Sequence, residues 1–279
     1  MKTITNSELS DFLQCRLKWQ FAYKDKLAPL QKDQKLRLGS AIHLAIADCL
    51  EGKEFSSDRF KNEYFKDYVG EVTEEQFDEL DVWLYYAQKV YSEMREIYKD
   101  VKVLFVEKKL EYRIPRTKTK YLCKIDAGIE NTNGKWILEH KTTSAYNSDY
   151  LFNLQINAQP TGYLWCLQKN SLDKYNGILY NIVLKFNKLL KNKKAWIDKN
   201  KLVHTEFITR NKTDVKLWLK MMRDIAYEFK RLKIYRSPSL DCRWKCAFKS
   251  LCIEDTDIGR LQFRKKRTKY EQYEKEVAE

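Results

Sequence analysis

The sequence predicts an α/β fold in which a mixed central sheet is flanked by helices. Apolar residues recur with helical spacing up to about residue 100, and the spacing then changes to that of strands. A hairpin, a further helix and more strands follow. Helices on either side of a run of strands cover a sheet in folds of this class. Gly and Pro are scarce, with 8 and 4 in 279 residues, so we expect long elements joined by short connections.

Three amphipathic helices are expected in the N-terminal part of the chain. The first covers 7–23, where an apolar residue recurs every four positions and Thr5 with Glu8 fits a capping box. The second covers about 36–51 and the third about 73–99. Their apolar stripes are Leu9, Leu13, Leu17 and Phe21, then Leu38, Ile42, Ile46 and Leu50, then Phe77, Leu80, Leu84, Ala87, Tyr91 and Met94.

The remaining elements are expected from a change of period and from turn residues. The run Asn-Thr-Asn-Gly at 131–134 is typical of a hairpin turn. Pro160 falls within a helical pattern and must kink or restart that helix. One domain is expected over 1–259, followed by a charged helix or tail over 260–279. The expected elements are strand 102–113, hairpin strands 121–130 and 135–143, helix 148–169, strands 177–184 and about 203–209, and a helix from 213 to about 235.

The charge balance favours a polyanionic partner. Lys and Arg number 53 against 39 Asp and Glu, which gives a formal net charge of +14. Such a protein binds nucleic acid well because each neutralised phosphate releases a counterion, and an anionic membrane surface is the competing partner. No apolar run reaches the length of a membrane span, and the N-terminus lacks the apolar run of a signal peptide. We therefore expect a cytoplasmic protein whose seven cysteines do not form disulfides.

Two carboxylates and a lysine are expected on one face of the hairpin. Side chains alternate along a strand, so Glu139 and Lys141 share a face, and Asp126 lies within reach of Glu139 across the hairpin. Hard cations such as Mg²⁺ prefer carboxylate oxygens, and a lysine beside them can orient or deprotonate the attacking water. The alternative is a solvated strand face with an ordinary salt bridge. The apolar neighbours Ile137 and Leu138 favour a strand inside the sheet, and hence a phosphodiesterase site.

This pattern resembles the PD-(D/E)XK superfamily, specifically the RecB-like exonucleases, which include CRISPR-associated RecB-like iron–sulfur nucleases and phage homologues. The resemblance implies a restriction-endonuclease-like core in which Asp126 and Glu139 bind Mg²⁺ or Mn²⁺ and Lys141 supports catalysis. The stretch Gly-Ser-Ala-Ile-His that ends at His43 resembles the family's Gly-x-x-x-His element, whose histidine is a metal ligand. The backbone carbonyl of His140 is expected to complete the metal site.

Other positions match the same family. Gly39 shares a helical face with the motif histidine, and a glycine there lets the helix approach closely. Gln159 and Tyr163 resemble the family's Gln-x-x-x-Tyr element, whose side chains line the site and help to place the DNA. Because Pro160 follows it, Gln159 is expected to cap the helix, and Gln155 is the fallback assignment.

Three closely spaced cysteines near the C-terminus indicate metal ligation. Cys242, Cys246 and Cys252 lie in a basic, irregular segment, where core packing seldom places three cysteines. A fourth ligand is needed, and Cys15 is the natural candidate. RecB-like iron–sulfur nucleases show this arrangement, which implies a [4Fe–4S] cluster that joins the two ends of the chain, although zinc would satisfy the same thiolates. The other cysteines are expected to be buried packing residues, namely Cys49, Cys123 and Cys166.

The expected function is that of a metal-dependent DNA exonuclease, a hydrolase that acts on DNA ends or single strands in recombination, replication or repair, with protein partners from those pathways. A phage-encoded homologue would act in the host cytoplasm. Two rivals are a non-catalytic nucleic-acid-binding protein with a structural metal site and a nuclease that acts on RNA. Glu107 is either a glutamate that family members carry one strand earlier or a surface residue. The side chains expected to follow the DNA backbone are Lys185, Lys188, Lys191, Lys193 and Lys194.

Overall fold

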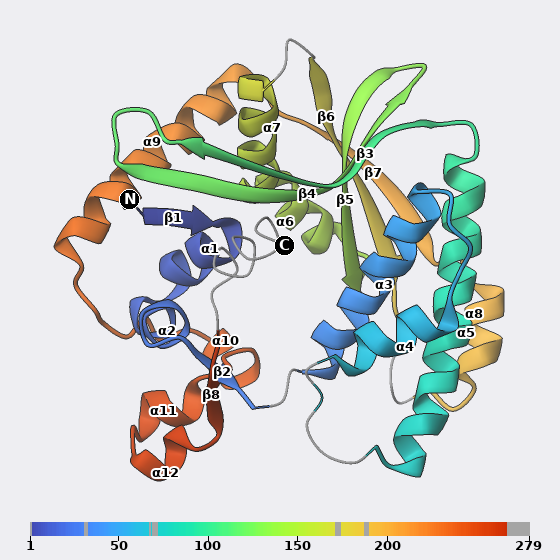
Figure 1. Cartoon of the computed structure of the whole chain (residues 1–279), viewed down its shortest axis with the longest axis horizontal. Coiled ribbons are helices and arrows are strands. Elements are labelled where there is room, and N and C mark those ends of the chain that lie inside the picture. Colours follow the sequence, from blue (N-terminus) through green and yellow to red (C-terminus); the bar gives the residue numbers. More distant parts are fainter. Residues whose placement is uncertain are drawn as a thin grey trace. The chain divides into compact units, whose positions relative to one another are not determined.

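Strand β5 (Gly134–Thr143) lies at the middle of a mixed sheet in the computed structural model of the chain (Figure 1). The described strands follow the order β1-β4-β5-β6-β7, and β3 also pairs with β4. The β1–β4 and β5–β6 pairs are parallel, whereas β4–β5 and β6–β7 are antiparallel. The predicted mixed α/β architecture is therefore confirmed. The other strands are β1 (Lys2–Thr5), β3 (Lys102–Arg113), β4 (Thr119–Asn131), β6 (Tyr175–Leu184) and β7 (Val203–Thr209).

The chain divides into two compact units, which we name the central unit and the terminal unit. The expectation of one nuclease domain over 1–259 stays a prediction. The structure describes residues 2–30, 33–66, 68, 72–170, 174–186 and 190–266. The central unit comprises Lys32–Leu110 and Lys124–Val215, and the terminal unit comprises Met1–Gln31, Glu111–Cys123 and Lys216–Glu279.

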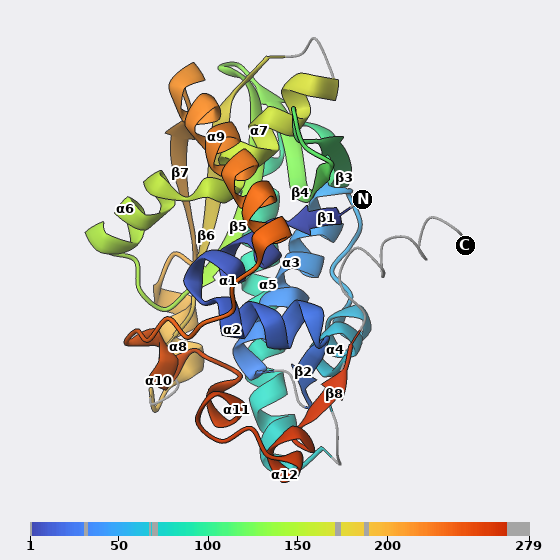
Figure 2. The ribbon, with the colours of Figure 1, turned by 90° about the vertical axis from the view of Figure 1, so that its left-hand side faces the viewer.

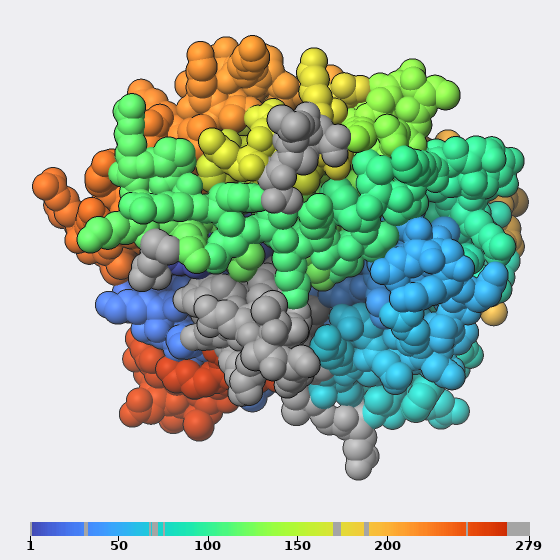
Figure 3. Space-filling view, turned by 45° about the horizontal axis from the view of Figure 1, so that its top comes forward, coloured from blue at the N-terminus to red at the C-terminus, as the bar shows by residue number. Residues whose placement is uncertain are grey.

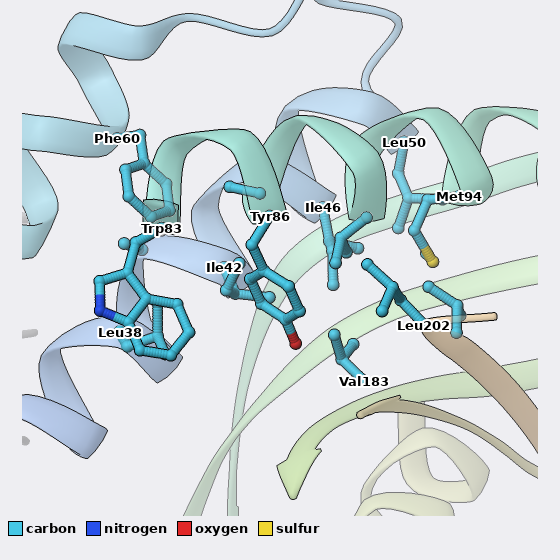
Figure 4. Close-up of a cluster of buried hydrophobic side chains, with 14 of the residues drawn as sticks. Leu38, Ile42, Ile46, Leu50, Phe60, Trp83, Tyr86, Met94, Val183 and Leu202 are labelled. Atoms are coloured by element: carbon cyan, nitrogen blue, oxygen red, sulfur yellow. The ribbon is translucent and has the colours of Figure 1, made fainter. Parts of the chain in front are cut away.

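Helices α3 (Gln34–Leu50) and α5 (Glu74–Tyr98) supply much of the hydrophobic core of the central unit. They confirm the helices predicted over 36–51 and 73–99, although Phe77, in the first turn of α5, is exposed. Figure 4 shows how their apolar side chains face one another and the strands. The residues labelled there are Leu38, Ile42, Ile46, Leu50, Phe60, Trp83, Tyr86, Met94, Val183 and Leu202. The remaining helices of this unit are α4 (Ser57–Phe65), α6 (Ser148–Ile156), α7 (Ala158–Asn170) and α8 (Lys193–Lys199).

The β4–β5 hairpin closes through a two-residue turn. Asn131 pairs with Gly134 across that turn, and Gly134 has a φ of +106°, which residues with a side chain rarely adopt. Further along the ladder, Ala127 pairs with Leu138. The predicted hairpin is therefore confirmed, and its register fixes which side chains of β4 and β5 lie opposite each other.

The helix predicted over 148–169 consists of two helices, α6 and α7. They are separated by Asn157, whose backbone is extended with ψ 127°. The Asn157 Oδ1 atom accepts a hydrogen bond from the Gln159 backbone N–H at 2.9 Å. Asn157 therefore caps α7, and the expectation that Gln159 is the cap was wrong. Pro160 lies in the first turn of α7, where its missing N–H costs little, so the predicted restart is confirmed.

Strand β3 confirms the strand predicted over 102–113. Most of its side chains are only partly buried, and they form part of the green band on the surface in Figure 3. Strands β6 and β7 likewise match their predicted positions. Within the described part of the chain, no helix is long and apolar enough to cross a membrane.

The terminal unit brings the first 30 residues together with the C-terminal segment. Strand β2 (Leu27–Pro29) pairs antiparallel with β8 (Phe263–Lys265), and Figure 2 shows this small sheet beside α11 and α12. The segment predicted as a helix or tail over 260–279 thus contains the strand β8, and residues 267–279 lie outside the described part of the chain. The helices of this unit include α1 (Asn6–Gln14), α2 (Arg16–Trp19), α10 (Asp241–Trp244), α11 (Lys249–Ile253) and α12 (Asp257–Arg260).

The prediction of a single helix over 7–23 is wrong, because the helix is interrupted at Cys15. That residue has an extended backbone, with φ −161° and ψ 122°, between α1 and α2. Just beyond the break, the backbone N–H of Leu17 donates to the carbonyl of Tyr235 at 3.1 Å. Leu13, expected on the apolar stripe, is 51% exposed. A contact with a segment more than 200 residues away along the chain thus stabilises a break that local periodicity does not predict.

Two smaller corrections concern helix ends. Thr5 Oγ1 accepts from the Glu8 N–H, but the Glu8 carboxylate accepts from Trp19 Nε1 at 3.0 Å, so only half of the predicted capping box forms. Helix α9 (Lys212–Glu228) ends before the predicted residue 235 and is followed by a 3₁₀ turn, Phe229–Arg231.

Candidate active site

The hairpin register brings the two predicted carboxylates together. Continuing the register by one residue beyond the Ala127–Leu138 pair sets Asp126 opposite Glu139. Asp126 Oδ2 accepts a hydrogen bond from the backbone N–H of His140 at 2.8 Å. The side chain of Asp126 is therefore held against β5 at the point where Glu139 leaves that strand.

Helix α3 contributes His43 to the same place. His43 Nδ1 lies 3.7 Å from Asp126 Oδ2, and the His43 ring lies edge-on to the His140 ring with their centroids 5.6 Å apart. A Cβ atom added to Gly39, one turn earlier, would meet Thr142 Oγ1 at 3.5 Å, an ordinary contact. The approach of α3 to β5 therefore does not require a glycine at position 39.

A chain of hydrogen bonds links β5 to α7. Lys141 Nζ donates to Glu139 Oε1 at 2.5 Å and to Gln159 Oε1 at 3.1 Å. Gln159 Nε2 in turn donates to the Tyr163 hydroxyl at 2.5 Å, and that hydroxyl favours the charged form of Glu139. The structure thus places Gln159 and Tyr163 beside the two β5 residues, whereas Gln155 is exposed on α6.

Burial and charge drive the pKa values of the two carboxylates apart. Burial raises the pKa of Glu139 to about 7, and the charge of Asp126 adds to this shift while Lys141 opposes it. Burial also favours the neutral form of Asp126, but the neighbouring His43 and His140 outweigh it and lower its pKa. At neutral pH Asp126 is therefore ionised, whereas Glu139 is protonated in part of the molecules.

The pKa values of the basic side chains of the site also shift in opposite directions, down for the two histidines and up for Lys141. Burial lowers the pKa of His140 to about 4 and also lowers that of His43, so both imidazoles are neutral at pH 7. Burial disfavours the Lys141 ammonium, but the Glu139 carboxylate outweighs this effect and raises the lysine pKa. Neutral imidazoles are able to ligate a metal, and Lys141 remains a charged donor.

Two buried polar atoms of this site have no hydrogen-bond partner within the described residues, Glu139 Oε2 and His140 Nε2. Glu139 is only 2% exposed, so water does not satisfy its oxygen from the open surface. Carboxylate oxygens beside an imidazole fit a hard divalent cation, which commonly keeps several water ligands as well. Among the described residues, no three His, Cys, Asp or Glu side chains converge on a preformed metal site. Cation binding would therefore complete the set with backbone or water oxygens.

Asn181 is a supporting residue that was not predicted from the sequence. Its Nδ2 atom lies 3.0 Å from His140 Nδ1, and its Oδ1 atom accepts from the Tyr98 hydroxyl at 2.7 Å. It was identifiable as a polar residue inside the apolar run of β6, because a buried amide needs hydrogen-bond partners. The pair fixes the orientation of the His140 ring, much as outer-shell partners orient metal-binding histidines.

Glu107 is placed on β3 in an ion pair with Lys124. Its φ of +56° is unusual for a residue with a side chain and marks an irregularity in the strand. Both side chains are about one-third exposed. The surface interpretation of Glu107 fits this environment, since no hydrogen bond or ion pair within the described residues joins it to Asp126 or Glu139.

The four cysteines predicted as ligands line one cavity in the terminal unit. The cavity has a volume of about 640 Å³ and is bounded by Cys15, Cys242, Cys246 and Cys252. Burial raises the pKa of the Cys246 thiol, and the nearby Cys242 and Cys15 act in the same direction. All four are free thiols. Figure 2 shows α2 near the segment from α10 to α11 that supplies three of them.

The other three cysteines lie elsewhere. Cys123 and Cys166 are buried, as expected for packing residues, whereas Cys49 is only partly buried. Burial raises the pKa of the Cys49 thiol to about 11, and its Sγ atom donates to the Tyr91 carbonyl at 3.8 Å. None of the three lines the cysteine cavity, so they are separate from the predicted ligand set.

The mixed sheet flanked by helices fits the result of a comparison with known families. The model of the PD-(D/E)XK nuclease superfamily matches residues 3–253. The chain belongs to the PD-(D/E)XK nuclease superfamily. Superfamily members are nucleases, which act on nucleic acid and typically use divalent cations such as Mg²⁺. The narrower RecB-like assignment stays a prediction.

This PD-(D/E)XK chain also matches a solved structure at low sequence identity. The solved crystal structure of SSO0001 is 16% identical, and the alignment covers 78% of this chain and 95% of that one, with a TM-score of 0.32. The comparison with curated proteins finds no match.

Proposed function

We propose that this PD-(D/E)XK nuclease is a divalent-metal-dependent DNA exonuclease that hydrolyses phosphodiester bonds at DNA ends or in single strands. The observation that carries the proposal is the buried, unpartnered Oε2 atom of Glu139 beside Lys141. A buried carboxylate oxygen without a hydrogen bond is costly in a purely structural salt bridge. The same atom is well suited to a cation that binds with the substrate.

The site residues take distinct roles in this proposal. Asp126, Glu139, His43 and the backbone carbonyl of His140 would hold Mg²⁺ or Mn²⁺. A cation there would stabilise negative charge on the phosphoryl group and lower the pKa of water. Lys141 orients the attacking water, because its ammonium is already fixed between Glu139 and α7.

Gln159 and Tyr163 support that arrangement from α7. Gln159 accepts from Lys141 and donates to Tyr163, so the lysine cannot rotate freely away from the strand. Gln159 is partly exposed, so its amide would help to place the DNA backbone, whereas Tyr163 is buried and would hold Gln159 in position.

Basic side chains beyond the site would follow the DNA. The Lys185 backbone N–H donates to the Thr143 carbonyl at 2.7 Å, only two residues beyond Lys141. Lys191, Lys193 and Lys194 belong to the same lysine-rich stretch, which continues into α8. Lys188 lies outside the described residues. The formal net charge of +14 supports binding to a polyanion.

We further propose that Cys15, Cys242, Cys246 and Cys252 hold a [4Fe–4S] cluster, with Zn²⁺ as the alternative occupant. Four thiols around one cavity are a suitable donor set for either. No three of them form a preformed site within the described residues, so the thiols would close on the metal as it binds. The cluster would be structural, because phosphodiester hydrolysis needs no electron transfer.

The biological setting belongs to the same proposal. A DNA exonuclease of this kind would act in the cytoplasm, in recombination, replication or repair, together with proteins of those pathways.

Digestion of end-labelled DNA tests the proposed function. Purified protein is incubated with single-stranded and duplex DNA, and with an RNA of the same sequence, in Mg²⁺ or Mn²⁺. Loss of nucleotides from the ends of DNA is expected. Cleavage of RNA alone would identify an RNA nuclease. Binding without any cleavage would instead identify a nucleic-acid-binding protein with a structural metal.

A further inference from the structure

The terminal unit contains a second cavity, which shares no lining residue with the cysteine cavity. Its volume is about 670 Å³. It lies between α1, the start of α2 and the segment that follows α9. None of the residues proposed for catalysis or for the cluster lines it, so its composition has no explanation in the functions described above. We name it the basic cavity.

Positive charge dominates the basic cavity. Arg16, Lys230, Arg231 and Lys233 line it, and Glu228 is the acidic residue among its lining residues. Lys230, Arg231 and Lys233 are exposed, and no ion pair within the described part of the chain includes them. Elsewhere on this protein, lysines are commonly paired with carboxylates, as Lys53 is with Glu51. Unpaired cations gathered around a hollow attract an anion.

Arg16 is held in place beneath this cavity. Its guanidinium lies over the Phe12 ring at 3.3 Å from the centroid, and its Nη2 atom donates to Glu228 Oε2 at 2.5 Å. Its Nη1 atom is buried and has no hydrogen-bond partner within the described residues. A guanidinium fixed in this way keeps its positive charge at the wall of the cavity, where it favours a phosphate.

Two exposed tyrosines complete the lining. Tyr227 is 52% exposed and Tyr235 is 54% exposed. The Lys230 ammonium lies 5.5 Å from the centre of the Tyr227 ring. Aromatic faces interleaved with lysines and arginines are typical of surfaces on which unpaired bases stack while the backbone contacts cations.

We propose that the basic cavity binds single-stranded DNA, with phosphates on Arg16, Arg231 and Lys233 and bases stacked on Tyr227 and Tyr235. Duplex DNA would use the cations equally well, but its base faces are stacked inside the helix and cannot reach the tyrosines. The exposed rings therefore favour a single strand. The proposal rests on the proposed function only in taking DNA as the ligand.

Fluorescence anisotropy of a labelled single strand of DNA tests the phosphate contacts of the proposal. The full chain is used without divalent cations, so that binding is measured in the absence of cleavage, over a range of salt concentrations. Losing two phosphate contacts in R231A/K233A should weaken binding about tenfold or more and reduce the salt slope by about 1.4. The control K53A/K99A removes two charges from exposed positions of the central unit and should change neither quantity.

The tyrosines are tested on the same strand and on a duplex of equal length. Tyr227→Ala and Tyr235→Ala should each weaken single-strand binding about 5- to 150-fold, the effect of losing one stacked base, with the salt slope and duplex affinity unchanged. Phe77→Ala, at an exposed aromatic residue of the central unit, should bind as the parent does. Parent affinity in all three cavity variants, or equal losses on strand and duplex, would overturn the proposal. Failure of the parent to cleave DNA in Mn²⁺ would contradict the proposed function and leave this binding result standing.

Discussion

In the proposed metal site, a proton and a divalent cation would compete for the Glu139 carboxylate. Burial raises its pKa from 4.5 to about 7 in the folded, metal-free chain. Because the folded state holds this proton more tightly than the unfolded one, Glu139 disfavours the metal-free fold increasingly as the pH rises from 4.5 to 7. A bound cation would remove that penalty by taking the place of the proton.

Manganese affinity should therefore depend on pH. Below pH 7, binding must displace the Glu139 proton, so the affinity should fall by about tenfold for each unit of pH, and above 7 it should level off. Asp126, whose pKa is lowered, adds no step in this range. Calorimetric titration with Mn²⁺ from pH 5.5 to 8 measures the effect. Glu139→Gln should bind weakly and lose the pH dependence, and an unchanged profile in that variant would place the metal elsewhere.

The residues proposed to carry the chemistry were easier to predict than those that support them. Asp126, Glu139 and Lys141 follow from strand alternation and a hairpin turn, which are local features of the sequence. Asn181 and Tyr98 lie 41 residues after and 42 before His140, and only folding shows that they form one hydrogen-bonded set. The packing of α5 and β6 brings these side chains together, and short-range sequence patterns do not predict that packing.

At the scale of elements, the break between α6 and α7 decides where Gln159 points. Asn157 caps α7 and thereby aims the second residue of that helix at Lys141. A continuous helix over 148–169 would rotate Gln159 to another face. In the sequence, Pro160 indicated that a new helix starts nearby. The cap itself depends on a hydrogen bond from the backbone to the Asn157 side chain, which many asparagines do not make.

Asn157→Ala should therefore affect both stability and cleavage. Losing the cap should lower the free energy of unfolding by about 1 kcal/mol, and the loosened Gln159 should slow cleavage by about tenfold or more. Urea denaturation and the rate of DNA digestion measure the two effects. Ser56→Ala removes a cap from α4, which carries no site residue, and should lower stability alone. Equal cleavage rates in the two variants would remove Asn157 from the positioning of the site.

The first two helices show where element prediction fails. Leucines at every fourth position predicted one helix over 7–23, yet the chain is extended at Cys15. The Leu17–Tyr235 backbone hydrogen bond and the cysteine cavity both need that break, and both depend on residues near the other end of the chain. In contrast, α3 and α5 were predicted correctly because their apolar stripes pack within a single core.

At the scale of the whole molecule, the two ends of the chain fold together. The terminal unit contains Met1–Gln31 and Lys216–Glu279, and the four candidate ligand cysteines lie within these two segments. A shared metal centre would close nearly the entire chain into a loop, which restricts the unfolded ensemble as a long-range cross-link does. Such a centre should therefore contribute strongly to stability.

Cys15→Ala should lose the cluster and melt at a lower temperature, although three ligands remain. Anaerobically purified parent protein is expected to be brown, with broad absorbance near roughly 400 nm. Iron analysis, absorbance and thermal melting measure the effect. Cys123→Ala, at a buried cysteine of the same unit outside the cavity, should keep its iron. Full iron content in Cys15→Ala would remove Cys15 from the ligand set, and stoichiometric zinc in colourless parent protein would favour the zinc alternative.

The central claim is that the β5 carboxylate and lysine hydrolyse DNA, and the cleavage rate of Lys141→Ala tests it most directly. End-labelled DNA is digested in Mn²⁺ by the parent, by Lys141→Ala and Glu139→Ala, and by Lys53→Ala as a surface control. We predict that the two site variants bind DNA, because phosphate contacts elsewhere remain, but do not cleave it, while Lys53→Ala cleaves at the parent rate. Cleavage by Lys141→Ala at the parent rate would contradict the account.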